Sequence, residues 1–374
     1  MISIRGDFES GSVNVLSAKR AGDIRLEIPK DSKACTRQWF YFSVTTEKPE
    51  TQKISLVNAG KTTYLMGWKG YRAFASYDLQ NWFRVDTIFE QGELKIEHQA
   101  TEQKVYYAYF VPYPLERKSN LIEKLKKSSY VEIEELCKTP LENSIELIKL
   151  RAKKKNNKKV WLIARQHPGE SMSQWVIEGM LESILNEPKL EQILSEVNFY
   201  IVPNMNPDGS QIGNHRTNNA GINLNRVWHS ADKIEAPEVF YVREALLKHG
   251  VDVFIDLHGD EAIPHNFMMV SGDMKSGNKI KEKLASVNPD FQLVYDYDND
   301  GLDSSESCCQ TSCCNSSCNI SAKATDFVAE NFDAVSLILE TSFKELERNG
   351  TTVAWDHDGC KRLGKSLWDV ITQE

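Results

Sequence analysis

Four short apolar runs in the C-terminal part of the chain constrain its fold most strongly. They lie at 160–164, 199–202, 251–257 and 334–339. Each is apolar and short enough to be a strand buried inside a central sheet. Helical stretches alternate with them, and the stretch at 171–185 carries apolar residues at the spacing of a buried helix face. This alternation predicts an α/β fold with a mixed central sheet flanked by helices.

The first part of the chain has a different pattern, which predicts strands joined by turns. Runs of aromatic and β-branched residues lie at 39–44, 63–66, 82–85 and 105–111. Pro112 and Pro114 interrupt this pattern, and a helical stretch follows from residue 120. We therefore expect two domains, an all-β sandwich at residues 1–112 and the α/β domain at residues 113–374.

The composition argues against several classes of protein. The 374 residues are 41% hydrophobic, which is enough to bury substantial cores. A formal net charge of −8 argues against nucleic acid as the main partner, since phosphate binding requires a basic surface. The first residues lack the pattern of a signal peptide, and no apolar run is long enough to span a membrane. We expect a soluble, cytoplasmic protein, and the sequence leaves its oligomeric state open.

Three of the four predicted strands lead into a residue suited to metal or proton chemistry. His167 follows the first run, His258 follows the third and Glu340 closes the fourth. Ligands of open α/β sheets bind beyond the carboxyl ends of the strands, so these side chains are expected to converge. His167 and Glu170 are three residues apart at a strand-to-helix junction, where both can face one ion. With His258 they form a set that leaves a catalytic zinc ion one position for water.

Each of these residues also has a plainer interpretation. A His and a Glu three residues apart occur often by chance, and such a pair also fits a surface histidine beside a helix. Glu340 points more firmly to function, because a carboxylate at the end of an apolar strand is costly to bury without a partner. Asp256 shares one face of its strand with His258, where it orients the imidazole or forms an ordinary cap or salt bridge.

A long polar stretch at 204–228 separates the second and third predicted strands. Its length and its glycines indicate a functional or a flexible loop. The guanidinium groups of Arg216 and Arg226 are planar and permanently charged, which suits a carboxylate or a developing oxyanion. Taken singly, each arginine is more often part of a surface ion pair.

Together these residues resemble the funnelin family of zinc metallocarboxypeptidases, whose pattern is HxxE, an arginine, Asn-Arg, His and Glu in that order. The ligands of one catalytic Zn²⁺ implied by the resemblance are His167, Glu170 and His258. The resemblance also implies that Arg216 polarises the scissile carbonyl and that Glu340 is the general base. Asn225 and Arg226 would bind the terminal carboxylate of the substrate.

The resemblance extends to the cytosolic carboxypeptidase subfamily, which couples a β-sandwich to the catalytic domain. Similar stretches lie at 38–42, 75–78, 82–85, 107–110 and 256–261. The resemblance implies hydrolysis of the C-terminal peptide bond of peptides or protein tails. Eukaryotic members trim glutamates from protein C-termini, notably on tubulin, so a preference for C-terminal glutamate is a hypothesis here. Such a preference would require a basic group in the side-chain pocket, for which Lys344 and His265 are candidates.

Two other functions are weighed against this one. A related zinc amidase or deacylase acting on small acylated amino acids uses the same ligands, but the long N-terminal domain and the Asn225-Arg226 pair disfavour it. A catalytically silent protein that binds C-terminal tails would be favoured by loss of Glu340 or of a ligand, and none is lost.

The segment between the third zinc ligand and the general base holds two further features. The family closes a mobile tyrosine on the substrate from this segment, and Tyr295 and Tyr297 are both candidates for that role or for plain packing. Residues 303–321 contain five cysteines among Ser, Asn and Gly, which predicts a surface loop. These thiols lack the paired CxxC spacing of a zinc site, so metal binding or redox gating is the minor alternative. The basic run at 153–159 is interpreted as a solvated turn rather than a site for acidic tails.

Overall fold

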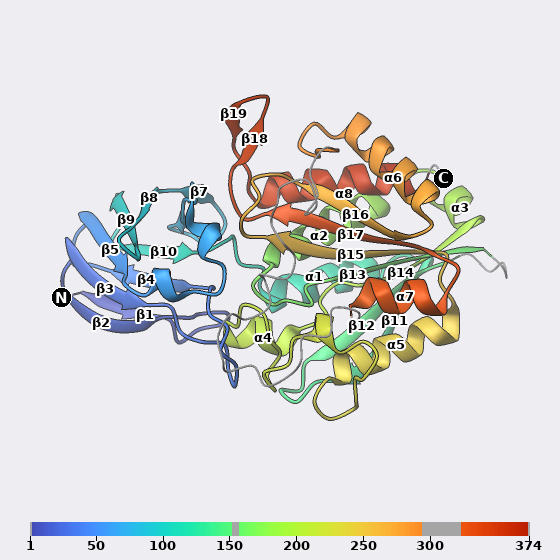
Figure 1. Cartoon of the computed structure of the whole chain (residues 1–374), viewed down its shortest axis with the longest axis horizontal. Coiled ribbons are helices and arrows are strands. Elements are labelled where there is room, and N and C mark those ends of the chain that lie inside the picture. Colours follow the sequence, from blue (N-terminus) through green and yellow to red (C-terminus); the bar gives the residue numbers. More distant parts are fainter. Residues whose placement is uncertain (1, 152–156, 294–322, 373–374) are drawn as a thin grey trace.

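The N-terminal part of the chain is a β-sandwich in the computed structural model, which describes residues 2–151, 157–293 and 323–372. Two five-stranded sheets face each other (Figure 1). The first sheet has the order β1 (Ser3–Arg5), β4 (Tyr41–Thr45), β10 (Lys104–Ala108), β6 (Phe74–Ser76) and β7 (Trp82–Arg84). The second has the order β2 (Asn14–Arg20), β3 (Asp23–Glu27), β5 (Thr51–Leu56), β9 (Glu93–Gln99) and β8 (Asp86–Glu90).

The alternation of side chains explains why these strands form a sandwich. In β5 the buried residues are every second one, Gln52, Ile54 and Leu56, so one face of the strand points inward. Two short 3-10 helices, η1 (Ala59–Lys61) and η2 (Leu65–Trp68), connect the sheets after β5. The predicted sandwich is confirmed, but the strand predicted at 63–66 is wrong. This run leads into η2, and the main chain of Tyr64 bonds to the side chain of Gln38 instead of to a neighbouring strand.

A seven-stranded mixed sheet forms the centre of the second part. Its order is β11 (Val131–Lys138), β12 (Ser144–Leu150), β14 (Val197–Val202), β13 (Lys158–Ala164), β15 (Val253–Asp260), β17 (Val335–Ser342) and β16 (Phe267–Gly272). The four inner strands β14, β13, β15 and β17 are parallel, whereas β11, β12 and β16 run antiparallel to their neighbours. The four parallel strands are the four apolar runs of the sequence, which confirms the predicted mixed sheet.

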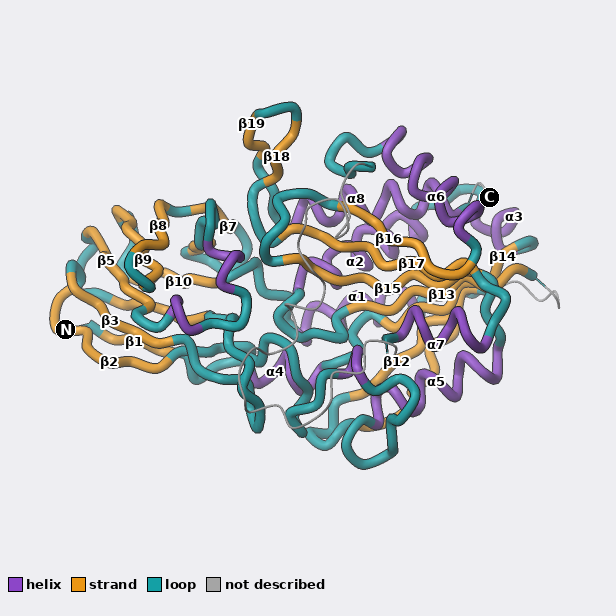
Figure 2. The backbone as a smooth tube through the Cα atoms, in the orientation of Figure 1, coloured by secondary structure: helices purple, strands orange, loops and turns teal. Residues whose placement is uncertain are grey.

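Helices cover both faces of this sheet, as Figure 2 shows. One face packs on α2 (Ser171–Leu185), α6 (Met274–Val287) and α8 (His357–Ile371), and the other packs on α5 (Pro237–His249) and α7 (Ala324–Asn331). In β13, Leu162 belongs to the core with α2, while its neighbours Trp161 and Ile163 belong to the core with α5 and α7. The remaining elements are α1 (Leu115–Leu125), α3 (Leu190–Leu194), α4 (Pro207–Ile212), η3 (Leu224–Arg226), β18 (Leu346–Arg348) and β19 (Thr351–Val353).

Glycines let α2 and α8 approach each other closely. A Cβ at Gly364 would lie 2.0 Å from the carbonyl oxygen of Val176, and a Cβ at Gly179 would lie 2.1 Å from that of Lys361. Only a residue without a side chain fits at these two positions.

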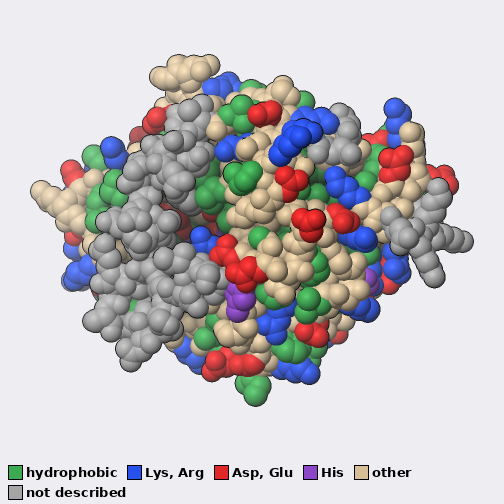
Figure 3. Space-filling model, turned by 45° about the vertical axis from the view of Figure 1, so that its right-hand side comes forward, with side chains coloured by type: hydrophobic (Ala, Val, Ile, Leu, Met, Phe, Trp, Pro, Cys, Tyr) green, Lys and Arg blue, Asp and Glu red, His purple; other side chains and the backbone are tan. Residues whose placement is uncertain are grey.

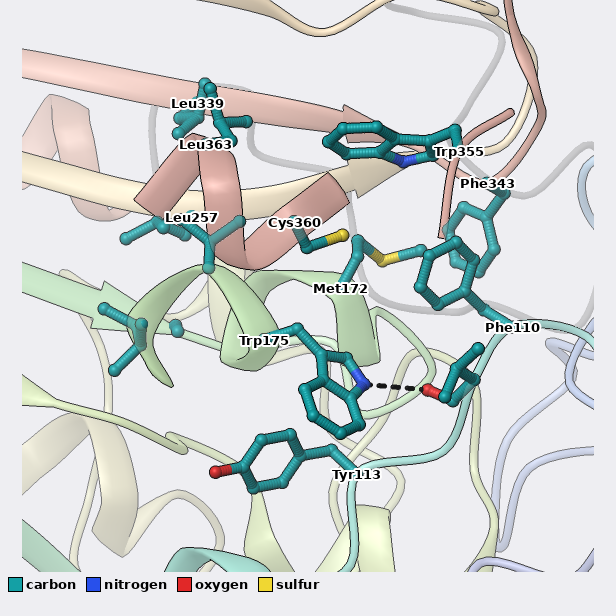
Figure 4. Close-up of a cluster of buried hydrophobic side chains, with 14 of the residues drawn as sticks. Phe110, Tyr113, Met172, Trp175, Leu257, Leu339, Phe343, Trp355, Cys360 and Leu363 are labelled. Carbon is teal, nitrogen blue, oxygen red and sulfur yellow. Dashed lines mark hydrogen bonds between the residues drawn. The ribbon is translucent and has the colours of Figure 1, made fainter. Parts of the chain in front are cut away.

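The two parts of the chain share one continuous core at their junction. Figure 4 shows Phe110 and Tyr113 packed among side chains of α2, α8 and the strand ends. The indole of Trp175 donates a hydrogen bond of 3.1 Å to the carbonyl of Val111, and Arg84 donates one of 2.8 Å to the carbonyl of Phe343. The domain boundary at residue 112 therefore stays a prediction, since no gap in packing marks it.

Several predicted features lie outside the described residues. They are Tyr295, Tyr297, the cysteine-rich segment 303–321 and most of the basic run 153–159. Within the described part of the chain, no helix combines the length and apolar character that crossing a membrane requires.

Candidate active site

The carboxyl ends of three neighbouring strands meet where the sheet approaches the β-sandwich. The arrowheads of β15 and β17 point towards the N-terminal part of the chain in Figure 1. His258 on β15 is the register partner of Glu340 on β17, and His167 follows β13, which pairs with β15 on its other side. The predicted convergence of these residues follows from this strand order.

A tight turn after β13 brings His167 and Glu170 to the strand ends. Arg165 begins the turn with a φ of 61°, a left-handed conformation that is uncommon outside glycine. Its buried guanidinium donates to the carbonyl of Pro168 at 2.9 Å and to the Gln174 side chain at 2.7 Å. These bonds hold the turn in a conformation that costs about 1–3 kcal/mol, as is common at functional sites.

His167, Glu170 and His258 form a buried cluster that fits a metal ion. Nδ1 of His167 is 2.6 Å from one carboxylate oxygen of Glu170, and Nδ1 of His258 is 2.9 Å from the other. One possible ligand atom from each residue lies within 4.8 Å of the others. Two imidazoles and a carboxylate are donors that zinc accepts, so the residues present fit a zinc ion.

Further polar groups fix the outer nitrogen of each imidazole. Nε2 of His258 lies 2.9 Å from Oδ2 of Asp256, which also accepts a 2.7 Å hydrogen bond from Gln166. Nε2 of His167 lies 3.1 Å from the side-chain oxygen of Asn223. Such partners orient a ligand imidazole and fix which nitrogen faces the metal. Asp256 lies where it can orient the imidazole of His258, one of the two interpretations that the sequence left open. The contacts of Gln166 and Asn223 were not predicted from the sequence.

The charges in the cluster depend on one another. Burial lowers the pKa of His167 to about 3, although Glu170 opposes this effect. Burial also disfavours the charged form of His258, but Asp256 and Glu170 together raise its pKa well above the ordinary value. Burial disfavours ionised Glu170, yet the two imidazoles hold its pKa below its usual range. The site therefore favours one carboxylate together with positive charge, which a divalent cation would supply.

Glu340 lies beside this cluster and is almost fully buried. Burial raises its pKa well above the ordinary value, and the nearby Glu170 and Asp260 add to the rise while His258 opposes it. A buried carboxyl with a raised pKa next to a candidate metal site is suited to proton transfer.

The polar stretch 204–228 brings Asn225 to the cluster. The side-chain nitrogen of Asn225 lies 3.2 Å from Nε2 of His258, and its oxygen accepts a 2.9 Å hydrogen bond from the amide of Ala324. Arg226 donates to the carbonyl of Asn225 at 2.7 Å. Arg216 is buried, and its charge further lowers the pKa of His167 after the larger effect of burial, so the guanidinium lies near the cluster.

His215 and Glu261 form a buried pair that the sequence pattern did not predict. Nε2 of His215 is 2.6 Å from a carboxylate oxygen of Glu261. A Cβ at Gly169 would lie 2.4 Å from Nδ1 of His215, so the turn of the HxxE motif requires glycine there. The position of Glu261, three residues after His258, was the available signal.

Lys344 was a candidate for recognising an acidic side chain. Its ammonium group donates instead to the carbonyls of Ala262 at 2.8 Å and Met66 at 3.2 Å. Burial lowers its pKa to about 8. In this conformation Lys344 ties the N-terminal domain to the strand ends.

A mixed sheet with buried His, Glu and His donors at its carboxyl edge defines a class of metal-dependent hydrolases. Two family models match this chain. The zinc carboxypeptidase model matches residues 119–346, and the cytosolic carboxypeptidase N-terminal domain model matches residues 4–110. The chain belongs to the zinc carboxypeptidase family and is a metallocarboxypeptidase. The predicted family and enzyme class are thus confirmed.

Similar proteins are known over the full length of the chain. An uncharacterized protein of Zymomonas mobilis is 35% identical over 383 residues, covering 100% of this chain and 96% of that protein. The crystal structure of a metallo-carboxypeptidase from Burkholderia cenocepacia is 33% identical with a TM-score of 0.90, covering 100% of this chain and 98% of that one. Mouse cytosolic carboxypeptidase 3 is 29% identical over 313 residues, which cover 73% of this chain but only 30% of the mouse protein.

Proposed function

We propose that this protein is a zinc-dependent carboxypeptidase that hydrolyses the last peptide bond of peptides or protein tails. The observation that supports this proposal most is the register of β15 and β17, which sets the buried Glu340 beside His258 of the candidate metal cluster. A carboxyl group next to a metal site with three protein donors is the arrangement that hydrolysis of an amide requires.

In this proposal one Zn²⁺ is held by Nδ1 of His167, Nδ1 of His258 and the carboxylate of Glu170. The contacts of both outer nitrogens with oxygen acceptors support this choice of ligand atoms. When bound, zinc supplies a Lewis acid that acidifies a water molecule and polarises a carbonyl group.

The protein groups then divide the remaining work. Glu340 accepts a proton from the attacking water and passes it to the leaving amine. Arg216 carries a permanent positive charge near the cluster and stabilises the oxyanion. Asn225 and Arg226 bind the free carboxylate of the substrate, which restricts cleavage to the C-terminal bond. A tyrosine at 295 or 297 closing on the substrate remains part of this proposal on the family resemblance alone.

The substrates proposed are peptides or protein tails with a free C-terminus, and C-terminal glutamate is the preferred residue to test first. The family resemblance of the sequence motivates that choice. Lys344 does not add support, because its ammonium group contacts carbonyl groups. The cytosolic carboxypeptidase relatives support a cytoplasmic location. On the described part of the face drawn in Figure 3, acidic and basic side chains are interspersed, so this part shows no continuous basic surface of the kind that phosphate binding requires.

The test is release of C-terminal amino acids from peptides that end in each residue type. Zinc-loaded wild type is compared with zinc-loaded Glu340→Gln and with chelated wild type. The proposal is supported if the zinc-loaded wild type releases C-terminal amino acids and both controls do not. The amino acid released fastest then gives the specificity. No release by the zinc-loaded wild type, combined with hydrolysis of small acylated amino acids, would favour the amidase. Binding of tails without release would favour a silent binding protein.

A further inference from the structure

The β-sandwich extends one buried charge into the catalytic part of the molecule. Among the described residues 2–110, Asp31 is the charged residue with a buried side chain, at 6% exposure. It lies in the irregular segment between β3 and β4, where its amide donates to the carbonyl of Thr36 at 2.8 Å and its carboxylate accepts from the Thr36 hydroxyl at 2.9 Å. Burying a carboxylate is costly, so its partners explain why it is tolerated.

The partners of Asp31 are the three successive amides of residues 215–217, which form the loop around Arg216. One carboxylate oxygen accepts the amide hydrogen of His215 at 2.7 Å, and the other accepts those of Arg216 at 2.8 Å and Thr217 at 3.0 Å. The Thr217 hydroxyl adds a longer contact of 3.2 Å. Hydrogen bonds to a charged acceptor are strong, and three in a row fix the backbone conformation of the loop.

The side chain of Arg216 also contacts the β-sandwich. Its guanidinium carbon lies 5.4 Å from the centre of the Tyr64 ring, within the range of a cation–π contact. Gln38, which is fully buried, holds the main chain of Tyr64 through bonds of 3.1 Å to its amide and 3.2 Å from the Gln38 side chain to its carbonyl. The sandwich thus contacts both the backbone and the charged end of Arg216.

Other hydrogen bonds also join the two parts of the chain. Ser32 donates its amide to the side chain of Asn214 at 2.9 Å and accepts a bond of 3.1 Å at its hydroxyl, and Asn214 in turn donates to the carbonyl of Thr217 at 3.0 Å. Ser10 donates to the carbonyl of Ser210 at 2.7 Å, outside the segment 214–218. Since these bonds already join the two parts, holding them together does not by itself explain why the Asp31 carboxylate binds the amides of residues 215–217.

We propose that Asp31 and Tyr64 are positioning residues for Arg216, so that the N-terminal domain completes the active site. Asp31 sets the backbone of the loop, and Tyr64 sets the direction of the guanidinium. This proposal rests on the proposed role of Arg216 in the hydrolysis, because displacing a catalytic group by about 1 Å can lower a rate about a hundredfold.

The first test measures the loop itself and needs no activity. Amide hydrogen exchange in the segment 214–218 is compared between wild type, Asp31→Ala, Asp31→Asn and the matched control Ser10→Ala, which removes a bond between the two parts outside this segment. We expect exchange at residues 215–217 to rise at least about tenfold in both Asp31 variants and to stay near wild type in Ser10→Ala. Unchanged exchange in Asp31→Asn, or an equal rise throughout 208–218, would overturn the proposal that Asp31 fixes the backbone of residues 215–217. The asparagine variant decides the result if the alanine variant does not fold.

The second test asks whether the contacts of Asp31 and Tyr64 with Arg216 affect the rate of the reaction. With zinc-loaded protein and the best C-terminal peptide, kcat should fall about ten- to hundredfold in Asp31→Asn while KM changes less than about threefold. Tyr64→Leu should lose more of kcat than Tyr64→Phe, which keeps the ring. Adding Asp31→Asn to Arg216→Ala should change kcat by less than about twofold, because the group being positioned is gone. Full multiplication of the two losses would overturn the proposal.

The two tests fail in different ways. If the wild type releases no C-terminal residue, the proposed carboxypeptidase fails, and the exchange measurement still decides whether Asp31 fixes the loop. If the wild type is active and the amides of residues 215–217 exchange equally in all variants, the positioning role of Asp31 is wrong and the proposed carboxypeptidase activity is supported.

Discussion

The β-sandwich and the cluster at the strand ends bury different kinds of side chain. Among the described residues 2–110, the buried polar residues are neutral except Asp31, and aromatic rings fill the interior. At the ends of β13, β15 and β17, Glu170, His258 and Glu340 are all buried, and Glu340 is the register partner of His258. Burying ionisable groups weakens a fold unless they are paired, so the cluster at the strand ends carries a cost that stability alone does not explain. This cost indicates that the function of the molecule lies at the strand ends.

The largest expected effect is the loss of activity in Glu340→Gln. The substitution keeps the size of the side chain but removes the general base, so kcat should fall about a thousandfold, or about 4 kcal/mol of activation free energy. The melting temperature should not fall, because the amide avoids the cost of burying a charge. The measurement is kcat of the zinc-loaded variant together with thermal unfolding.

Glu347→Gln is the matched control, since Glu347 is exposed on β18 a few residues further along the chain. It should keep wild-type kcat. If Glu340→Gln kept more than a tenth of the activity, Glu340 would not be the base.

A second expected effect concerns the pH dependence of stability in the catalytic part. Burial raises the pKa of Glu238 on α5 to about 7 from an ordinary value of 4.5. The folded state therefore binds a proton more tightly than the unfolded state. Its stabilising contribution is complete below about pH 4.5 and is lost as the pH rises to about 7. At 1.36 kcal/mol for each of the 2.5 pH units between 4.5 and 7, the loss is about 3 kcal/mol.

Denaturant unfolding of wild type and Glu238→Gln at pH 5 and pH 7.5 measures this contribution. The variant should be more stable than the wild type at pH 7.5 and similar to it at pH 5, because glutamine does not ionise. An equal difference at both pH values would show that ionisation of Glu238 is not the cause.

The third effect compares helix packing in the catalytic part with an open turn of the sandwich. Gly364→Ala should destabilise the protein by about 2 kcal/mol, since the new methyl group meets the carbonyl of Val176 across the contact between α2 and α8. Gly22→Ala should change the free energy of unfolding by less than about 0.5 kcal/mol, because nothing lies within 4 Å of the added Cβ. Equal effects in urea unfolding would mean that α2 and α8 tolerate separation.

The smallest effect is expected for a surface ion pair of the sandwich. Lys53 and Glu97 lie 2.9 Å apart, and more than half of each side chain is exposed. Lys53→Ala should therefore cost less than about 1 kcal/mol, and salt should reduce that cost further. A loss of several kcal/mol in urea unfolding would show that charge affects stability as much in the sandwich as in the cluster at the strand ends.

The sequence predicted the strands that are buried on both faces better than the edge strands. The runs around Leu162, Ile201, Ile255 and Leu337 are continuous and apolar, so β13, β14, β15 and β17 could be recognised. β11 at the edge of the sheet has the sequence VEIEELCK, with charged residues interrupting the apolar ones, and it was not foreseen. Its strand character depends on pairing with β12.

The residues of the candidate site also differ in how far the sequence could locate them. His167, His258 and Glu340 could be placed at neighbouring strand ends because each follows or closes an apolar strand, while their roles stay predictions. Asn223, Gln166 and Asp31 could not, because their roles depend on contacts between segments far apart in sequence. Asp31 stands in an irregular polar segment, where nothing in the local pattern separates it from an ordinary turn residue. The roles of Tyr295 and Tyr297 stay predictions.

The most direct measurement is a crystal structure of the zinc-loaded protein with anomalous scattering recorded above and below the zinc absorption edge. We expect one strong anomalous peak within about 2.0–2.2 Å of Nδ1 of His167, Nδ1 of His258 and a carboxylate oxygen of Glu170. Glu340 should lie beside the metal without binding it. A peak elsewhere, or direct coordination through the Nε2 atoms that face Asn223 and Asp256, would contradict the proposed metal site.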